Sequence, residues 1–281
     1  MKLHHFEDAS LFYNLVKEYL LNQEALHNLQ LGIANTLIHH PEVYKSQPYL
    51  ATVEAGGDIV AVAMRTPPHV LLLSQIKDGR AVEMIAQDLY LSSRSLPGVN
   101  APTAEAQAFA EKWRSLSGQS YKLKMATRAF QLEKVNFVST AKGYLRLARE
   151  SDRELLKNWC EAFWLEIGES INSNSEQWVE RSLRQGNIYL WENEMSVSMA
   201  CSGQPTPNGV RIGLVYTPLQ YRRQGYASAC VATLSQTLLN QGHKYCFLFT
   251  DLANPTSNHI YQAIGYQPVG DWNNYSFVEK A

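Results

Sequence analysis

Residues 215–228 hold the side chains whose types and spacing best suit a binding task. The segment reads VYTPLQYRRQGYAS, in which a strand ends at Thr217-Pro218, a polar loop follows and a helix opens around Gly225. The first turn of a helix leaves backbone N–H groups without partners, and the helix dipole favours negative charge there. Gly225 removes a side chain where an anion would approach, and Arg222 and Arg223 add positive charge. The pattern predicts a pyrophosphate cradle, and an ordinary strand-to-helix turn is the alternative.

A second informative stretch, residues 251–266, reads DLANPTSNHIYQAIGY. Asn254-Pro255 is a typical helix start, with asparagine as N-cap and proline at the first helical position. Asn254, Asn258 and Tyr261 are spaced i, i+4 and i+7, so they share one helix face. Two amides and a phenol on one stripe suit hydrogen bonds to a ligand, and a solvated polar face is the alternative.

Neither the G-x-x-x-x-G-K-[ST] nor the G-x-G-x-x-G phosphate loop occurs in the sequence. Residues 222–227, RRQGYA, instead resemble the R/Q-x-x-G-x-G/A loop of the GCN5-related N-acetyltransferases (the GNAT family). Residues 215–218 and the block at 251–266 resemble the same family. Ala227 stands where a second glycine is commoner, a replacement that the family tolerates. The resemblance covers residues 143–281 and implies acetyl-CoA as the acyl donor.

By this resemblance, backbone amides at 224–228 bind the pyrophosphate, and the backbone at 214–216 pairs with the pantetheine arm where two strands splay apart. Tyr261 is the expected catalytic residue, a general acid that protonates the departing thiolate. Tyrosine remains protonated at neutral pH, which suits that role. The positions assigned to the cofactor are Leu214, Val215, Tyr216, Thr217, Arg222, Arg223, Gln224, Gly225, Tyr226, Ala227, Ser228, Asn254, Asn258 and Tyr261.

The general base is left open by the sequence. The candidates are four carboxylates, each of which is more simply explained as a surface or capping group: Asp251, Glu161, Glu166 and Glu169. Cysteine nucleophiles are set aside because Cys230 and Cys246 lack a recognisable histidine partner. No His/Asp/Glu cluster has metal-ligand spacing, so we expect no metal.

The elements that position these residues form an α/β chain with a mixed sheet. Around the candidate site the expected elements are helices at Arg153–Glu166 and 225–240, strands at Gly209–Tyr216 and Tyr245–Asp251, a helix at Pro255–Ile264 and a closing strand at Tyr275–Glu279. The first 37 residues read as helix, followed by strands at Tyr49–Glu54, Ile59–Arg65 and His69–Ser74.

Two rounds of similar element order predict two domains, at 1–135 and 143–281. The length, 281 residues, is close to twice the ~150 residues of a typical domain. We expect two GNAT-like domains, intact in the carboxyl half and degenerate in the amino half. The loop Gln75–Arg80 of the amino half has one glycine and no R-x-x-G-x-G/A pattern, so this half is expected to bind no CoA and to wall the acceptor pocket. An unrelated α/β domain is the alternative.

Composition narrows the class of protein further. Lys and Arg number 25 against 26 Asp and Glu, a balance that does not support a nucleic-acid binder. No apolar run approaches the ~20 residues of a membrane span, and the start, MKLHHFEDAS, has no signal core. The cysteines lie far apart, as expected of reduced cytoplasmic thiols. They are Cys160, Cys201, Cys230 and Cys246.

These features favour an acetyl-CoA-dependent N-acetyltransferase that acts on a primary amine by direct attack. A small-molecule acceptor is favoured over a protein, and the oligomeric state is not indicated. A non-catalytic acyl-CoA-binding regulator is the alternative, although a regulator has no need of Tyr261. A nucleotide-binding fold lacks an acidic ribose partner.

Overall fold

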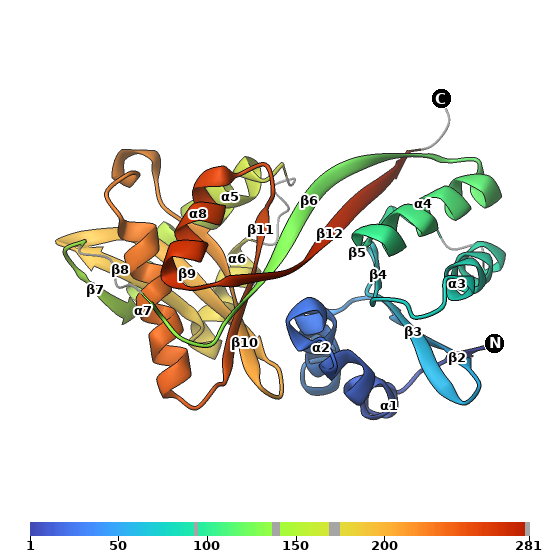
Figure 1. Cartoon of the computed structure of the whole chain (residues 1–281). Coiled ribbons are helices and arrows are strands. Elements are labelled where there is room, and N and C mark those ends of the chain that lie inside the picture. The colour runs from blue at the N-terminus through green and yellow to red at the C-terminus, as the bar shows by residue number, and fades with distance from the viewer. Residues whose placement is uncertain (93–94, 137–140, 169–174, 279–281) are drawn as a thin grey trace. The chain divides into compact units, whose positions relative to one another are not determined.

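The computed structural model describes residues 1–92, 95–136, 141–168 and 175–278 (Figure 1). The chain forms two compact units. The amino-terminal unit comprises residues 1–130, 249–255 and 268–281, and the carboxyl-terminal unit comprises residues 131–248 and 256–267. The expected contiguous division differs from the structure at 131–135, which group with the carboxyl-terminal unit, and at 249–255 and 268–281, which group with the amino-terminal unit.

The elements of the first half are β1 (Lys2–His5), α1 (Ala9–Leu21), α2 (Glu24–His39), η1 (Pro41–Val43), β2 (Tyr49–Ala55), β3 (Asp58–Arg65), β4 (Leu71–Leu73), α3 (Arg80–Leu91), β5 (Gly98–Pro102), α4 (Thr103–Ser117) and β6 (Ser120–Leu132). Those of the second half are β7 (Tyr144–Leu147), η2 (Glu150–Asp152), α5 (Arg153–Glu166), α6 (Ser175–Gln185), β8 (Ile188–Asn193), β9 (Met195–Pro205), β10 (Gly209–Tyr216), η3 (Leu219–Tyr221), α7 (Tyr226–Asn240), β11 (Tyr245–Asp251), α8 (Pro255–Ile264) and β12 (Gln267–Val278).

The sheet of the amino-terminal unit has the order β1-β2-β3-β4-β5-β12-β6. β4 and β5 are parallel, whereas β12 is antiparallel to β5 from Trp272↔Pro102 to Ser276↔Gly98. A Cβ at Gly98 would collide with the carbonyl oxygen of Tyr275, so only glycine permits this close approach. One core gathers side chains of α3 and α4, and a second gathers those of α1 and α2.

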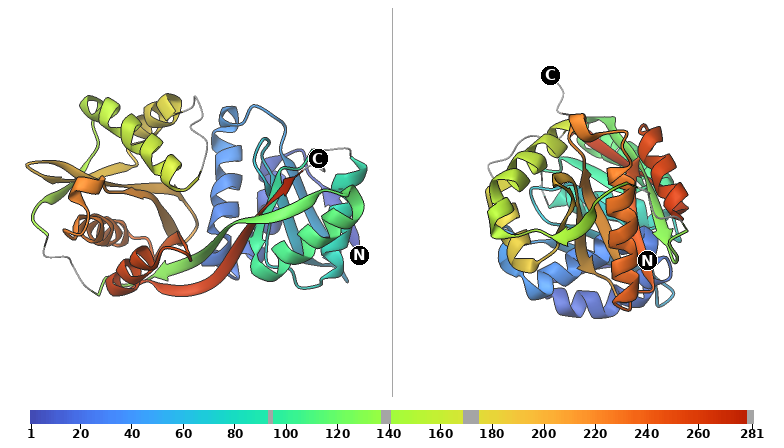
Figure 2. Two further views of the ribbon diagram at one scale, coloured as in Figure 1. Left: turned by 90° about the horizontal axis from the view of Figure 1, so that it is seen from above. Right: turned by 90° about the vertical axis from the view of Figure 1, so that its left-hand side faces the viewer.

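In the carboxyl-terminal unit the strands follow the order β11-β10-β9-β8-β7. Helices α5 and α6 cover one face and α7 the other, as Figure 2 shows. α5 is amphipathic because Leu156, Trp159 and Cys160 face the strands, where they pack with residues of β8, β9 and β10. These packed layers hold the end of β10 and the start of α7 at fixed positions, which is what a binding loop between them requires.

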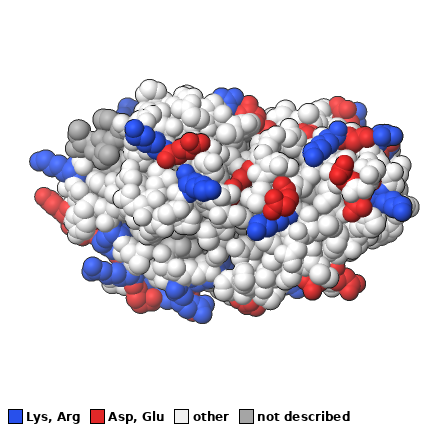
Figure 3. All heavy atoms as spheres, turned by 60° about the horizontal axis from the view of Figure 1, so that its bottom comes forward, with Lys and Arg blue, Asp and Glu red and all other residues white. Residues whose placement is uncertain are grey.

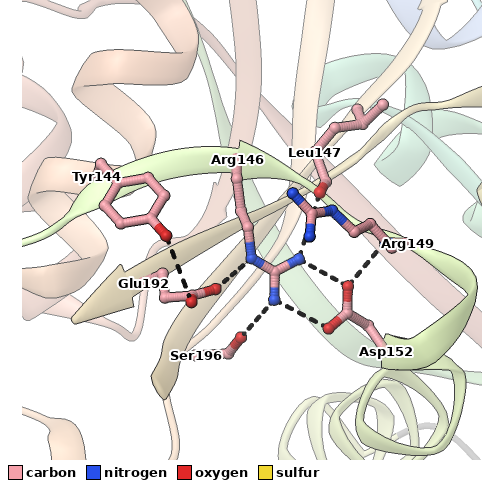
Figure 4. A network of polar contacts seen from close by, with 7 residues as sticks. All are labelled: Tyr144, Arg146, Leu147, Arg149, Asp152, Glu192 and Ser196. Carbon is pink, nitrogen blue, oxygen red and sulfur yellow. Dashed lines mark hydrogen bonds and ion pairs between the residues drawn. The ribbon is translucent and has the colours of Figure 1, made fainter. Parts of the chain in front are cut away.

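A polar network fastens the outer strands of this unit (Figure 4). Arg146 of β7 makes two hydrogen bonds to the carboxylate of Asp152, at 2.7 and 2.9 Å, and also contacts Glu192 of β8 and Ser196 of β9. Asp152 in turn accepts from the backbone N–H of Arg149 at 2.7 Å. The bidentate geometry ties β7 to the start of α5.

Two expectations about elements are wrong, and one strand was not expected. The first 37 residues are not all helix, because Lys2–His5 forms a strand that pairs with β2. The closing strand begins at Gln267 and not at Tyr275. Residues 98–102, where the sequence predicts no element, form β5 because β4 and β12 hold them in the sheet from both sides.

Candidate functional site

The strand that leads to the site, β10, is irregular where a ligand would need its backbone. Leu214 has a φ of +49°, and the antiparallel register with β9 shifts between Gly213 and Tyr216, which marks a β-bulge. The parallel pairing with β11 extends from Gly209 to Arg211, and among the described residues it ends there. The edge of β10 at 214–216 is thus outside the ladder with β11. A left-handed leucine is strained, and such strain persists where function requires the geometry.

The loop after β10 has an unusual backbone conformation just before α7. Arg223 has a φ of +61° and Gly225 a φ of +80°, so two left-handed residues closely precede Tyr226, the first residue of the helix. Successive N–H groups in such a turn form a concave nest that attracts anions. The first turn of α7 contains no acidic residue, so no acidic side chain of that turn competes with a ligand for the nest.

Two side-chain contacts hold this loop in place from within the protein. Tyr226, which is 8% exposed, accepts a hydrogen bond from Asn193 of β8 at 2.8 Å. Thr217 hydrogen-bonds Ser198 of β9 at 2.9 Å. Sequence reasoning missed Asn193 and Ser198, because neither belongs to a motif and only the strand pairing brings them to the loop.

The two arginines of the loop differ in what their side chains do. The Arg222 guanidinium donates to the carbonyl of Thr217 at 2.8 Å and to Glu166 at 2.5 Å, and it lies over the ring of Tyr216. Arg223 is exposed. The positive charge expected at the mouth of the loop therefore comes from one arginine that the protein holds and one that faces solvent.

Tyr261 lies in the core of the carboxyl-terminal unit. It is 8% exposed, and its ring meets that of Tyr266 edge-on with centroids 6.1 Å apart. Burial, followed by the proximity of Cys230, raises the pKa of Tyr261 above the ordinary value of tyrosine. On the same helix Asn258 is half-buried, while Asn254, just before the helix, is exposed. The phenol is thus protonated at neutral pH, as a proton donor must be.

The carboxylates considered as general base are engaged elsewhere where the structure describes them. Asp251 accepts from the backbone N–H of Ala253 at 2.8 Å and so builds the turn before α8. Glu161 accepts from Ser175 at 2.7 Å, and Glu166 pairs with Arg222. Glu169 lies outside the described residues.

The cysteines are buried thiols. Burial raises the pKa of Cys160, Cys230 and Cys246 to about 12 and shifts that of Cys201 in the same direction. Such thiols remain protonated at neutral pH and are poor nucleophiles. Within the described ranges, no three His, Cys, Asp or Glu side chains could hold a metal ion together, and no helix is long and apolar enough to cross a membrane.

The amino-terminal unit has a loop at the corresponding place, between β4 and α3. Backbone N–H groups of this loop donate hydrogen bonds to carboxylates. Asp78 accepts from the backbone N–H of Arg80 at 3.1 Å, and Glu105, in the first turn of α4, accepts from that of Ile76 at 3.0 Å. The N–H of Gln75 donates to His27 at 3.0 Å. These contacts satisfy three amides of the loop, and the Asp78 carboxylate is itself paired with the Arg80 guanidinium at 2.6 Å.

The surface carries no concentration of one charge on the face that Figure 3 shows. Lys and Arg side chains are interspersed with Asp and Glu, and most of that face is uncharged. That face therefore shows no basic stripe of the kind that binds a nucleic-acid backbone.

The comparisons with known proteins agree with this geometry. Residues 193–277 match the family model described as FR47-like protein. No curated protein matches the sequence. Among solved structures, a GNAT-family acetyltransferase from Colwellia psychrerythraea is similar over 100% of both chains, with 13% identity and a TM-score of 0.59. A GCN5-related N-acetyltransferase from Sphaerobacter thermophilus is similar over 99% of this chain and 96% of its own, with 12% identity and a TM-score of 0.64.

The fold is therefore that of the GNAT acetyltransferases, as the resemblance implied. A tandem GNAT protein from the clavulanic acid biosynthesis pathway is similar over 100% of both chains, with 12% identity and a TM-score of 0.57. The fold of this chain is similar to that tandem arrangement over its whole length, and the FR47-like match lies in the carboxyl half. The expected α/β fold with a mixed sheet and two GNAT-like domains is confirmed.

Proposed function

We propose that the protein is an N-acetyltransferase that transfers acetyl from acetyl-CoA to a primary amine by direct attack. The observation that carries the proposal is the combination, within one unit, of the bulge at Leu214 and the amide nest at Arg223–Gly225. The first leaves a strand edge for an amide-bearing chain, and the second suits a pyrophosphate. Acetyl-CoA has both parts, and GNAT structures share the fold.

The chain's own residues divide the work of holding acetyl-CoA. The backbone at 214–216 pairs with the pantetheine arm, and the amides of Gln224–Ser228 bind the pyrophosphate. Thr217 and Arg222 shape the loop, while the exposed Arg223 supplies charge. Asn254 and Asn258 offer side-chain amides along the first turns of α8. The thioester supplies an activated acetyl group.

The reaction requires one proton to leave the attacking amine and one to reach the departing thiolate. The amine must be neutral when it attacks, so a base accepts its proton, directly or through water. Tyr261 donates its hydroxyl proton to the sulfur as the thiolate leaves. Because its pKa is raised, the hydroxyl carries its proton at neutral pH. A small-molecule amine is the proposed acceptor, since the near-neutral net charge of −1 gives no preference for a cationic polymer.

The test of Tyr261 is its replacement by phenylalanine, which retains the ring and removes the donor. Acid assistance contributes about 10²–10⁴-fold, so kcat should fall at least tenfold even with water as a substitute, while the Kd of acetyl-CoA changes little. Tyr266→Phe is the matched control, because Tyr266 is a buried tyrosine hydrogen-bonded to Ser235. It should reduce stability and leave kcat unchanged. Wild-type kcat in Tyr261→Phe would refute the assignment.

A non-catalytic acyl-CoA-binding regulator is the second candidate. One observation favours it: Asp251, Glu161 and Glu166 are all engaged in other contacts. A thiol-release assay with a panel of amines, run beside calorimetry with CoA, separates the two. Binding together with turnover supports the enzyme, and binding without turnover of any amine supports the regulator.

We also propose that the amino-terminal unit binds no CoA. The carboxylates of Asp78 and Glu105 on its loop amides support this. Calorimetry on the intact chain should give one CoA per chain, and two equivalent sites would contradict the proposal. Gly225→Glu should abolish CoA binding, because the new carboxylate would repel the pyrophosphate at the nest of the carboxyl-terminal unit.

A further inference from the structure

Arg222 and Glu166 link three parts of the carboxyl-terminal unit. The Nε of Arg222 donates to the carbonyl of Thr217 at 2.8 Å, which closes the loop between β10 and α7 on itself. One terminal nitrogen of Arg222 lies 2.5 Å from Glu166, and the guanidinium stacks over Tyr216 with 5.9 Å to the ring centroid. Arg222 therefore contacts the end of α5, the end of β10 and the loop at once.

Glu166 lies at an unfavourable end of its helix for a carboxylate. It is the last residue of α5, where the helix dipole disfavours negative charge. Burial and the charge of Glu166 both raise the pKa of the nearby Tyr216. The side chains of Arg222 and Glu166 are 38% and 44% exposed, so solvent screens the pair and its contribution is modest.

We infer that Glu166 is a positioning residue for the acyl-CoA loop and not the general base of the reaction. It orients the Arg222 guanidinium, which in turn fixes Thr217 and the path of the backbone to the nest at Arg223–Gly225. The inference rests on the proposed function, because it concerns the loop that holds the pyrophosphate. A residue in this role acts on the binding of CoA, whereas a general base acts on the rate of transfer.

The experiment compares Glu166→Ala with Glu166→Gln. Loss of an exposed ion pair corresponds to roughly a three- to fivefold rise in the Kd of CoA for the alanine variant, measured by calorimetry. Glutamine still offers Arg222 an acceptor oxygen and should recover part of that loss. At saturating acetyl-CoA, kcat and its pH profile should match the wild type in both variants. Glu154→Ala, which removes an exposed carboxylate from the same helix, should leave the Kd unchanged.

A second comparison tests whether Glu166 acts through Arg222. Arg222→Gln removes the cation, so adding Glu166→Ala to it should cause no further rise in Kd. The advantage of the wild type over Glu166→Ala should also shrink as salt is raised.

The inference is overturned if the two substitutions have independent effects on Kd. It is equally overturned if both Glu166 variants lose about 10²-fold or more in kcat together with the acidic limb of the pH profile, as removal of a general base would cause. If the wild-type protein binds no CoA, the proposed function itself fails, and that outcome is recognised before any variant is made.

Discussion

His27 makes the amino-terminal unit sensitive to mild acid. The imidazole is 2% exposed; its Nδ1 donates to the carbonyl of Leu20 at 3.0 Å and its Nε2 accepts from the N–H of Gln75 at 3.0 Å. A protonated ring would direct an N–H at the N–H of Gln75. Burial lowers the pKa of His27 from 6.5 to about 4, only partly offset by the bond to Leu20. The Tyr19 ring stacks on the imidazole, and the Lys77 ammonium lies over the Tyr19 ring, so neither side chain supplies a negative charge that would stabilise a protonated His27.

The size and sign of the effect follow from linkage. In the unfolded chain the imidazole takes up a proton below about pH 6.5, whereas the folded protein resists until about pH 4. Stability is therefore complete above the unfolded pKa, declines as the pH falls through this window and levels off below it. At 1.36 kcal/mol per pH unit, the decline attributable to His27 is about 3 kcal/mol.

Two measurements check this reasoning. Titration of the histidine ring protons by NMR should show one imidazole that remains neutral down to about pH 4. Chemical denaturation between pH 7.5 and 4 should show a smaller loss of stability in His27→Gln than in the wild type, by about 3 kcal/mol. His39→Gln, an exposed position on the same helix, controls for loss of an imidazole. An imidazole at position 27 that titrates near 6.5, or equal pH dependence of His27→Gln and wild type, would refute the reasoning.

Two further predictions concern packing and charge. Gly98→Ala should lower the free energy of unfolding by about 1–3 kcal/mol, because a methyl group there collides with the backbone of Tyr275. Thermal or chemical unfolding measures the change. Gly79→Ala is the control: no described atom lies within 4 Å of a Cβ at that position, so the free energy of unfolding should not change. Arg146 lowers the pKa of Asp152, so Asp152→Asn should cost about 1.5–3 kcal/mol at pH 7. That cost should shrink as the pH falls below the unfolded value near 4, where the wild type also loses the charge; a cost independent of pH would contradict the ion pair.

The sequence alone located the elements whose signals are local. β10 spans Gly209–Tyr216 and α8 spans Pro255–Ile264, both as expected, because alternation and a capped proline start are written within the segments themselves. The same holds for the GNAT resemblance at 222–227, since a loop motif depends on neighbours in sequence. Local signals therefore sufficed for the fold class and for the position of the candidate loop.

Features set by distant partners were not accessible from the sequence. β12 extends from Gln267 because β5 pairs with it, and Gly98 is glycine because Tyr275 lies against it and not because a turn occurs there. The left-handed Leu214 likewise has no local signature, since leucine rarely adopts that conformation and only the bulge against β9 imposes it. Register and close approach are tertiary properties, and a periodicity argument does not contain them.

The loop between a strand and the following helix differs in its side chains between the two units. In the carboxyl-terminal unit the loop before α7 has left-handed residues at Arg223 and Gly225, with no acidic residue in the first helical turn. In the amino-terminal unit the corresponding amides already have carboxylate partners, Asp78 and Glu105. A helix start with its own negative charge is stable without a ligand, whereas one without it gains stability when an anion binds. If the proposed function holds, the side chains at this loop, more than the shared fold, explain why the carboxyl-terminal unit and not the amino-terminal one would bind CoA.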